Sequence, residues 1–145
     1  MHLLLTIDFS ETSRSAVPEA AALARKLGAK ITLLHVVPNT LLVPVADLGV
    51  PPRTPRIWSQ QWSNAEHRLA EVRPLLGDDL IVDTVVIDGE NVAHTIATWA
   101  RDHHADAIMM ACHGRSGISR IAFGSVAEEV LRVSTTPVFL IPPRG

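Results

Sequence analysis

The amino-acid sequence predicts an α/β fold with a single five-stranded parallel sheet and helices on both of its faces. Short apolar runs alternate with segments of helical periodicity along the whole chain, in the order β-α-β-α-β-α-β-α-β. The runs are nearly continuously apolar, which is typical of parallel strands that are covered on both faces. The length of 145 residues with 47% hydrophobic residues is that of one domain with a core of its own, so we expect residues 1–145 to form a single domain.

The first half of the chain contains two strands around one main helix. The first strand is expected at residues 2–8, HLLLTID, an apolar run that ends in an acid. Apolar residues then recur at helical spacing over residues 16–27, and Gly28 stands where a C-terminal cap is expected. Pro18 either lies in the first turn of this helix or kinks a longer one. Residues 30–37, KITLLHVV, are typical of a second strand.

The second half continues the alternation after an irregular connection. Residues 38–55 contain five prolines and no apolar period, which predicts an excursion over the surface. The remaining elements are expected as a helix at 57–76, a strand at 80–87, a helix at 91–103, a strand at 106–112, a helix at about 126–133 and a strand at 137–142. Parallel sheets bind ligands at the C-terminal ends of their strands, so the loops after Asp8, Val37, Ile87 and Cys112 are the candidate binding loops.

Charge and composition exclude several functional classes. Thirteen Lys and Arg against fifteen Asp and Glu give a net charge of −2, so we expect neither a nucleic-acid nor a membrane partner. The single cysteine, Cys112, excludes an internal disulfide framework and indicates a reducing compartment. No stretch reaches the roughly 18 apolar residues that a membrane span needs, and we expect a cytoplasmic protein. Neither a P-loop nor the Gly-x-Gly-x2-Gly dinucleotide pattern occurs.

The loop after the fourth strand carries the pattern most suggestive of chemistry. Gly114 and Gly117 free the backbone to turn, and Gly124 allows a ligand to approach the start of the next helix. The first N–H groups of that helix, at Ser125 and Val126, have no intrahelical acceptor, and the helix dipole favours an anion there. The pattern therefore predicts a phosphate site. The alternative is a tight turn in which Ser125 serves only as the N-cap.

The same loop resembles that of the universal stress protein family. The nucleotide-binding branch of this family carries Gly-x2-Gly-x9-Gly-(Ser/Thr) after its fourth strand, and Gly114, nine further residues and Gly124-Ser125 match its second half. The resemblance spans the chain and includes IDFS at 7–10, HVV at 35–37 and TPVFLIP at 136–142. It implies a Rossmann-like fold of the nucleotide-binding α-hydrolase type, and ATP with Mg²⁺ as ligands. The first glycine of the motif falls on Ala111, which places a methyl group where a ribose or phosphate passes.

The resemblance also implies where the nucleotide lies. The adenine is expected by the backbone of Val36 and Val37, and Asp8 by the ribose or a metal-bound phosphate. A carboxylate just past the end of the first strand also faces the expected crevice and is a candidate Mg²⁺ ligand in its own right, unless it serves only as a helix cap. The expected nucleotide-site residues are Thr6, Ile7, Asp8, Val36, Val37, Met110, Ala111, His113, Gly114, Arg115, Gly117, Gly124, Ser125 and Val126.

These residues lead to three functional hypotheses. The first is an ATP-binding regulatory protein of stress adaptation that acts on an unidentified protein partner. The second is a slow Mg²⁺-dependent ATPase, although we find no catalytic residue because no general base or arginine finger is evident. The third is a nucleotide-free interaction module. In each case we expect a homodimer through the apolar edge at the end of the chain, which consists of Val138, Phe139, Leu140 and Ile141.

Other reactive residues fit structural roles better. Cys112 and His113 are adjacent at a strand end and point to opposite faces, which suits a nucleophile and its base badly. His35 on an apolar strand is expected to be an interior imidazole with a hydrogen-bond partner. The histidines at 103 and 104 are expected to lie at a solvated helix end. Trp58, Trp62 and Trp99 are expected to be packing residues.

Overall fold

The computed structural model describes residues 1–39, 55–112 and 124–142. Five strands form one sheet in the order β3-β2-β1-β4-β5, and every neighbouring pair is parallel. The predicted fold class is therefore confirmed. The strands are β1 (His2–Thr6), β2 (Lys30–Pro38), β3 (Val82–Gly89), β4 (Ala107–Ala111) and β5 (Val138–Ile141).

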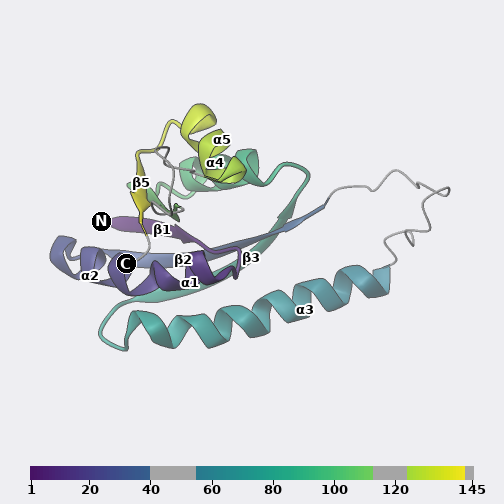
Figure 1. Ribbon diagram of the computed structural model, residues 1–145, viewed down its shortest axis with the longest axis horizontal. Helices are drawn as coiled ribbons and strands as arrows, with labels where there is room; N and C mark the ends of the chain where they lie inside the picture. Colours follow the sequence, from purple (N-terminus) through teal and green to yellow (C-terminus); the bar gives the residue numbers. More distant parts are fainter. Residues whose placement is uncertain (40–54, 113–123, 143–145) are drawn as a thin grey trace, which may run out of the picture.

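Helices cover both faces of this sheet, as Figure 1 shows. The helices α2 and α3 share one hydrophobic core with one face, and α4 and α5 share a second core with the other face. The short helix α1 lies on the same side as α2 in Figure 1. None of the described helices is long and apolar enough to cross a membrane. The helices are α1 (Glu11–Ser15), α2 (Val17–Leu27), α3 (Pro55–Val72), the 3₁₀ helix η2 (Arg73–Leu76), α4 (Val92–Asp102) and α5 (Ser125–Val133).

The alternation of side chains along the central strands explains why their sequences are continuously apolar. On β1, Leu3 and Leu5 point into the core under α2 and α3, whereas Leu4 points into the core under α4 and α5. On β4, Met109 and Ile108 divide in the same way. Since β1 and β4 are buried on both faces, the residues that point to either face are mostly apolar.

The predicted helix at 16–27 is preceded by a separate short helix. Ser10 caps α1 by accepting a hydrogen bond from the backbone N–H of Ser13 at 3.1 Å, and the chain turns at Ala16 before α2 begins. Pro18 lies in the first turn of α2, which settles the two positions left open by the sequence. Gly28 ends α2 with φ of 59°, in the left-handed region that favours glycine.

The strand order determines where a ligand site can form. From β1 the sheet grows outward to β2 and β3 on one side and to β4 and β5 on the other. The connections on the two sides lie on opposite faces, so they diverge beyond the C-terminal ends of β1 and β4 and leave a crevice there. Most of the irregular connection predicted at 38–55 lies outside the described residues.

Candidate functional site

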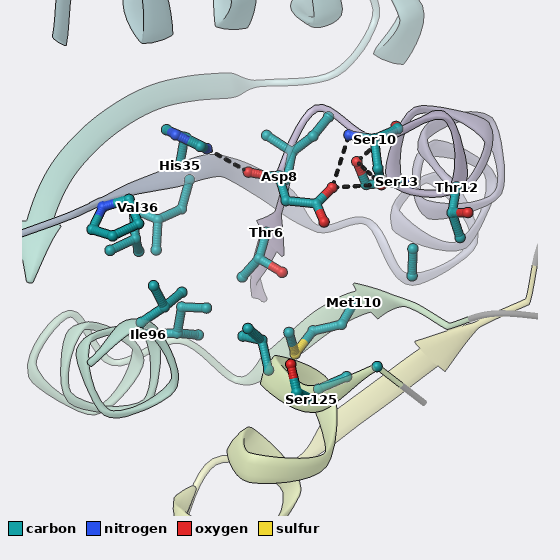
Figure 2. Close-up of a pocket in the computed structure, with 18 residues that line it drawn as sticks. Thr6, Asp8, Ser10, Thr12, Ser13, His35, Val36, Ile96, Met110 and Ser125 are labelled. Atoms are coloured by element: carbon teal, nitrogen blue, oxygen red, sulfur yellow. Dashed lines mark hydrogen bonds between the residues drawn. The ribbon is translucent and has the colours of Figure 1, made fainter. Parts of the chain in front are cut away.

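A pocket of about 550 Å³ lies at this crevice, within the size range of small-molecule sites. Figure 2 shows its walls: the loop after β1, the end of β2, one face of α4, the end of β4 and the start of α5. The predicted site residues that line it are Thr6, Ile7, Asp8, Val36, Met110, Ala111, Gly124, Ser125 and Val126.

The other predicted site residues are placed differently. The side chain of Val37 is buried in the core under α2 and α3 and does not line the pocket. The sequence analysis expects only the backbone of Val37, and not its side chain, to lie near the adenine. His113, Gly114, Arg115 and Gly117 lie outside the described residues.

The pocket also contains residues that sequence reasoning missed. Ser10 and Ser13 are typical helix-capping residues, and hydroxyl residues that follow an Asp also suit a polar ligand site. Val92 and Ile96 share one face of the helix expected at 91–103, and helical periodicity does not distinguish a core position from a pocket wall. The missed lining residues are Ser10, Thr12, Ser13, Leu34, His35, Pro38, Val92, Ile96 and Ala127.

Of the described residues that line this pocket, Asp8 alone is acidic. Its Oδ1 atom accepts hydrogen bonds from the backbone N–H of Ser10 at 2.9 Å and from the Ser10 hydroxyl at 2.6 Å. Partial burial raises the pKa of Asp8, but the hydrogen bonds from Ser10 and Ser13 outweigh it and hold the pKa below its ordinary value. Asp8 is therefore an ionised acceptor at neutral pH.

The backbone on either side of Asp8 is held by side chains from other elements. The Nδ1–H of His35 donates to the carbonyl oxygen of Ile7 at 2.7 Å, and Nη2 of Arg68 donates to that of Phe9 at 3.3 Å. Phe9 has φ of 64°, a left-handed conformation that is uncommon for a residue other than glycine. The Phe9 ring packs against His35 and Arg68. Its centroid lies 4.4 Å from that of the His35 ring and 4.3 Å from the guanidinium carbon of Arg68. These contacts hold the strained turn in place.

His35 is a neutral hydrogen-bond donor in this arrangement. Burial lowers the pKa of His35, and the positive charge of Arg68 lowers it further against the opposing effect of the bond to Ile7. The neutral ring must carry its proton on Nδ1 to donate to the Ile7 carbonyl. The expected interior imidazole with a partner is confirmed, although His35 also lines the pocket.

One end of the pocket is apolar. Val36 comes from β2 and Met110 from β4, the strands on either side of β1, and Ile96 comes from α4. All three are almost fully buried. Val92 adds a further aliphatic side chain from the first turn of α4. Aliphatic walls of this kind suit a flat, weakly polar group such as a purine ring.

Another part of the pocket wall is formed by the start of α5, where Ser125 lies beside Met110 in Figure 2. Gly124 is the N-cap of this helix, with φ of 79° and ψ of 144°, and no side chain caps the helix among the described residues. The N-cap is therefore Gly124 rather than Ser125. The first N–H groups of α5 have no intrahelical acceptors, and they carry the positive end of the helix dipole. This part of the pocket suits an anion.

The residues present also fit a divalent ion held mainly by a ligand. Among the described residues no group of three or more His, Cys, Asp or Glu side chains is placed to hold a metal. Magnesium commonly takes only one or two carboxylates and fills its remaining positions with phosphate oxygens and water. Asp8 could supply the single carboxylate of such a site.

Comparisons with known proteins agree on one family. The model of the universal stress protein family matches residues 1–142. A universal stress protein of Methanocaldococcus jannaschii is 27% identical over 152 residues, covering 96% of this chain and 93% of the relative. The solved structure of that protein superimposes with a TM-score of 0.77 at 24% identity, covering 99% of this chain and 96% of that one.

Two further solved structures have the same fold and contain nucleotides. The universal stress protein from Archaeoglobus fulgidus in complex with dAMP gives a TM-score of 0.64 at 19% identity, with 97% of each chain covered. A universal stress protein in complex with cAMP gives a TM-score of 0.64 at 20% identity, with 97% of this chain and 95% of that chain covered.

Proposed function

Because the chain belongs to the universal stress protein family, we propose that it is a cytoplasmic regulatory protein that binds an adenine nucleotide, ATP above all, in the pocket between β1 and β4. The observation that carries the proposal is the order of chemical surfaces around this pocket. An aliphatic end, an ionised acceptor and the start of a helix correspond to the base, the sugar and the phosphates of a nucleotide.

In this proposal the purine lies against Val36 and Ile96, where burying its flat faces is favourable. The phosphates lie at Gly124, Ser125 and Val126 and accept hydrogen bonds from the first N–H groups of α5. The relatives with dAMP and cAMP support the ligand class, since both ligands are adenine nucleotides. The triphosphate is the part of the proposal that rests on the glycine motif of the sequence.

Magnesium would be held mainly by the phosphates, and Asp8 would serve as its carboxylate ligand only in place of the sugar hydroxyls. When bound, this ion would neutralise part of the phosphate charge beside a carboxylate that would otherwise repel it. Asp8 itself supplies an oxygen that points into the pocket, as Figure 2 shows. We expect ATP to bind more tightly with Mg²⁺ than without it, and adenosine to be indifferent to the ion.

We also propose a homodimer through β5. This strand pairs with β4 on one side and has no partner on its other side among the described residues. Phe139 is 39% exposed there, and Val138 and Leu140 are half-buried. An apolar strand edge is prone to pair with another chain, and a second copy of β5 would cover it.

The proposal is tested by heating the purified protein and identifying any nucleotide that is released. Calorimetric titration with Mg-ATP then measures the affinity. We expect an adenine nucleotide in the extract or saturable binding of added ATP. Absence of both would leave the nucleotide-free interaction module. Steady release of phosphate from ATP at a rate well above the spontaneous one would favour the slow ATPase instead.

A further inference from the structure

Ser10 makes two hydrogen bonds to the same oxygen of Asp8. Its backbone N–H lies 2.9 Å and its hydroxyl 2.6 Å from Oδ1, and neither bond reaches Oδ2. The short hydroxyl contact is typical of a charge-assisted hydrogen bond to a carboxylate. Figure 2 shows the second oxygen of Asp8 on the side that faces the pocket. The two bonds from Ser10 therefore restrict the rotation of the carboxylate.

The direction of the Ser10 hydroxyl proton is determined by α1. The hydroxyl oxygen accepts a hydrogen bond from the backbone N–H of Ser13 at 3.1 Å, and the hydroxyl of Ser13 donates in turn to the Ser10 carbonyl at 3.0 Å. A serine hydroxyl has one proton to donate, and the short contact to Asp8 takes it in preference to the 3.3 Å contact to the Ser13 hydroxyl. The start of α1 thus orients Ser10, and Ser10 orients Asp8.

We propose that Ser10 is a positioning residue for the nucleotide: it holds Asp8 so that Oδ2 is preset to accept hydrogen bonds from the sugar hydroxyls. This inference rests on the proposed nucleotide function. The sugar is the expected donor because Asp8 lies across the pocket from Ser125, and Val36 and Ile96 line the end for the base. An ionised carboxylate has no proton to offer, so it selects groups that donate.

Presetting matters because Asp8 is otherwise free to turn. Asp8 lies in the loop after β1 and is exposed, so a carboxylate without these hydrogen bonds would lose rotational freedom when the ligand bound. A group that is already fixed in the binding orientation loses less entropy on binding. Removing the Ser10 hydroxyl should therefore weaken binding of the sugar, although Asp8, the residue proposed to contact the sugar, is unchanged.

Calorimetric titration with two probes, adenosine and 2′,3′-dideoxyadenosine, tests the inference. We expect Ser10→Ala to weaken adenosine binding by about tenfold and to leave dideoxyadenosine binding unchanged, since the latter has no sugar hydroxyl. Ser10→Thr keeps the hydroxyl and should restore adenosine binding. Ser15→Ala is the matched control, because the Ser15 hydroxyl belongs to the same helix, donates to the Thr12 carbonyl at 2.8 Å and does not line the pocket.

A double-mutant cycle with Asp8→Ala separates positioning from a general loss of structure. In the Asp8→Ala background, Ser10→Ala should have no further effect on adenosine binding. Should Ser10→Ala fail to fold, Ser10→Cys replaces it with a similar shape and a much poorer donor. An equal loss for both probes, additivity in the cycle, or unchanged adenosine binding would overturn the inference. A wild-type protein that binds neither probe nor ATP would instead overturn the proposed function.

Discussion

At the start of α5, Gly124 has a conformation that is open without strain only to glycine. The absent side chain also lets a ligand reach the first N–H groups of the helix. Ala111 presents the reverse case, since a methyl group lines the pocket where the resemblance noted in the sequence implies a glycine. In the proposed nucleotide site, these two positions determine how closely the backbone and the ligand approach each other.

Gly124→Asp is expected to weaken ATP binding by roughly a hundredfold or more. The substitution places a negative charge and added bulk at the proposed phosphate site, and two hydrogen bonds to a charged group are each worth about 1.5–3 kcal/mol. Gly124→Ala is the control, since it introduces the backbone strain without the charge. Isothermal titration, with circular dichroism to verify folding, measures the effect. Unchanged ATP affinity in folded Gly124→Asp would place the phosphates elsewhere.

Ala111→Gly is expected to leave ATP binding intact or to tighten it. The change removes one methyl group from the pocket wall at the end of β4 and places a glycine where the resemblance implies one. The same titration measures it. A loss of tenfold or more would show that the methyl group contributes to binding and that the nucleotide lies against it.

Residue-level sequence reasoning reached Asp8 and Gly124 because each has a local signature, an acid after a strand and a glycine before a helix. It missed the second role of Ser10 because a capping serine looks the same in sequence whether or not its proton reaches a neighbouring carboxylate. Val37 was included with Val36, yet the two alternate across the strand and only Val36 lines the pocket.

At the scale of elements, α4 and α5 both contribute to the pocket wall, and a side chain links them. Asn91 caps α4 by accepting from the backbone N–H of His94 at 2.9 Å, and its side-chain amide donates to Glu129 of α5 at 2.9 Å. The Asn91 side chain therefore both caps α4 and contacts α5. The sequence predicted a helix at 91–103 from periodicity, but the link to α5 depends on packing that no local pattern records.

Asn91→Ala is expected to lower the free energy of unfolding by about 1 kcal/mol or somewhat more, since it removes an N-cap and a contact between helices. Asn91→Asp should lose less of the cap, because it keeps the acceptor for His94, but it brings a carboxylate close to Glu129. Urea denaturation of the three proteins measures the difference. Equal stability of wild type and Asn91→Ala would contradict the assigned cap.

The end of α2 is tied to the turn before β3 by Arg25 and Asp79. The Arg25 guanidinium donates two hydrogen bonds to Asp79, at 2.6 and 2.7 Å, and these lower the pKa of Asp79 from 3.8 to about 2. A folded-state pKa below the unfolded value stabilises the fold above the unfolded pKa, and this contribution is lost as pH falls through the folded pKa.

Asp79→Asn is therefore expected to flatten the loss of stability of the protein between about pH 4 and pH 2. Both side chains are largely exposed, so salt should reduce the effect. Thermal melts of wild type and variant across this range measure it. An identical acid dependence in the two proteins would show that the pair does not contribute.

For the whole molecule, the sheet order distinguishes two edges. The edge strand β3 exposes Asp83 and Thr84, whereas the edge strand β5 exposes Phe139. Charged and polar side chains discourage pairing between strand edges, so β5 is the edge better suited to a second copy. The alternation of strands and helices in the sequence predicted the sheet, but only the strand order shows which strands lie at its edges.

Phe139→Asp is expected to shift the proposed homodimer toward monomer, because it places a charge in the apolar edge. Sedimentation at micromolar concentration measures the mass, and Asp83→Asn at the other edge serves as the control. A wild-type protein that sediments as a monomer would remove the dimer from the proposed function. A dimer that persists in folded Phe139→Asp would move its interface to another surface.

The central position of β1 has a consequence for the kinetics of folding. The pocket combines the loop after β1 with Gly124 and the first turn of α5, so its two sides come from opposite ends of the chain. Contacts so distant in sequence form slowly, and during synthesis the second side emerges after nearly all of the sheet. A nucleotide that requires both sides has no binding site on partly folded chains. Its stabilisation should therefore appear as slower unfolding, with the refolding rate unchanged.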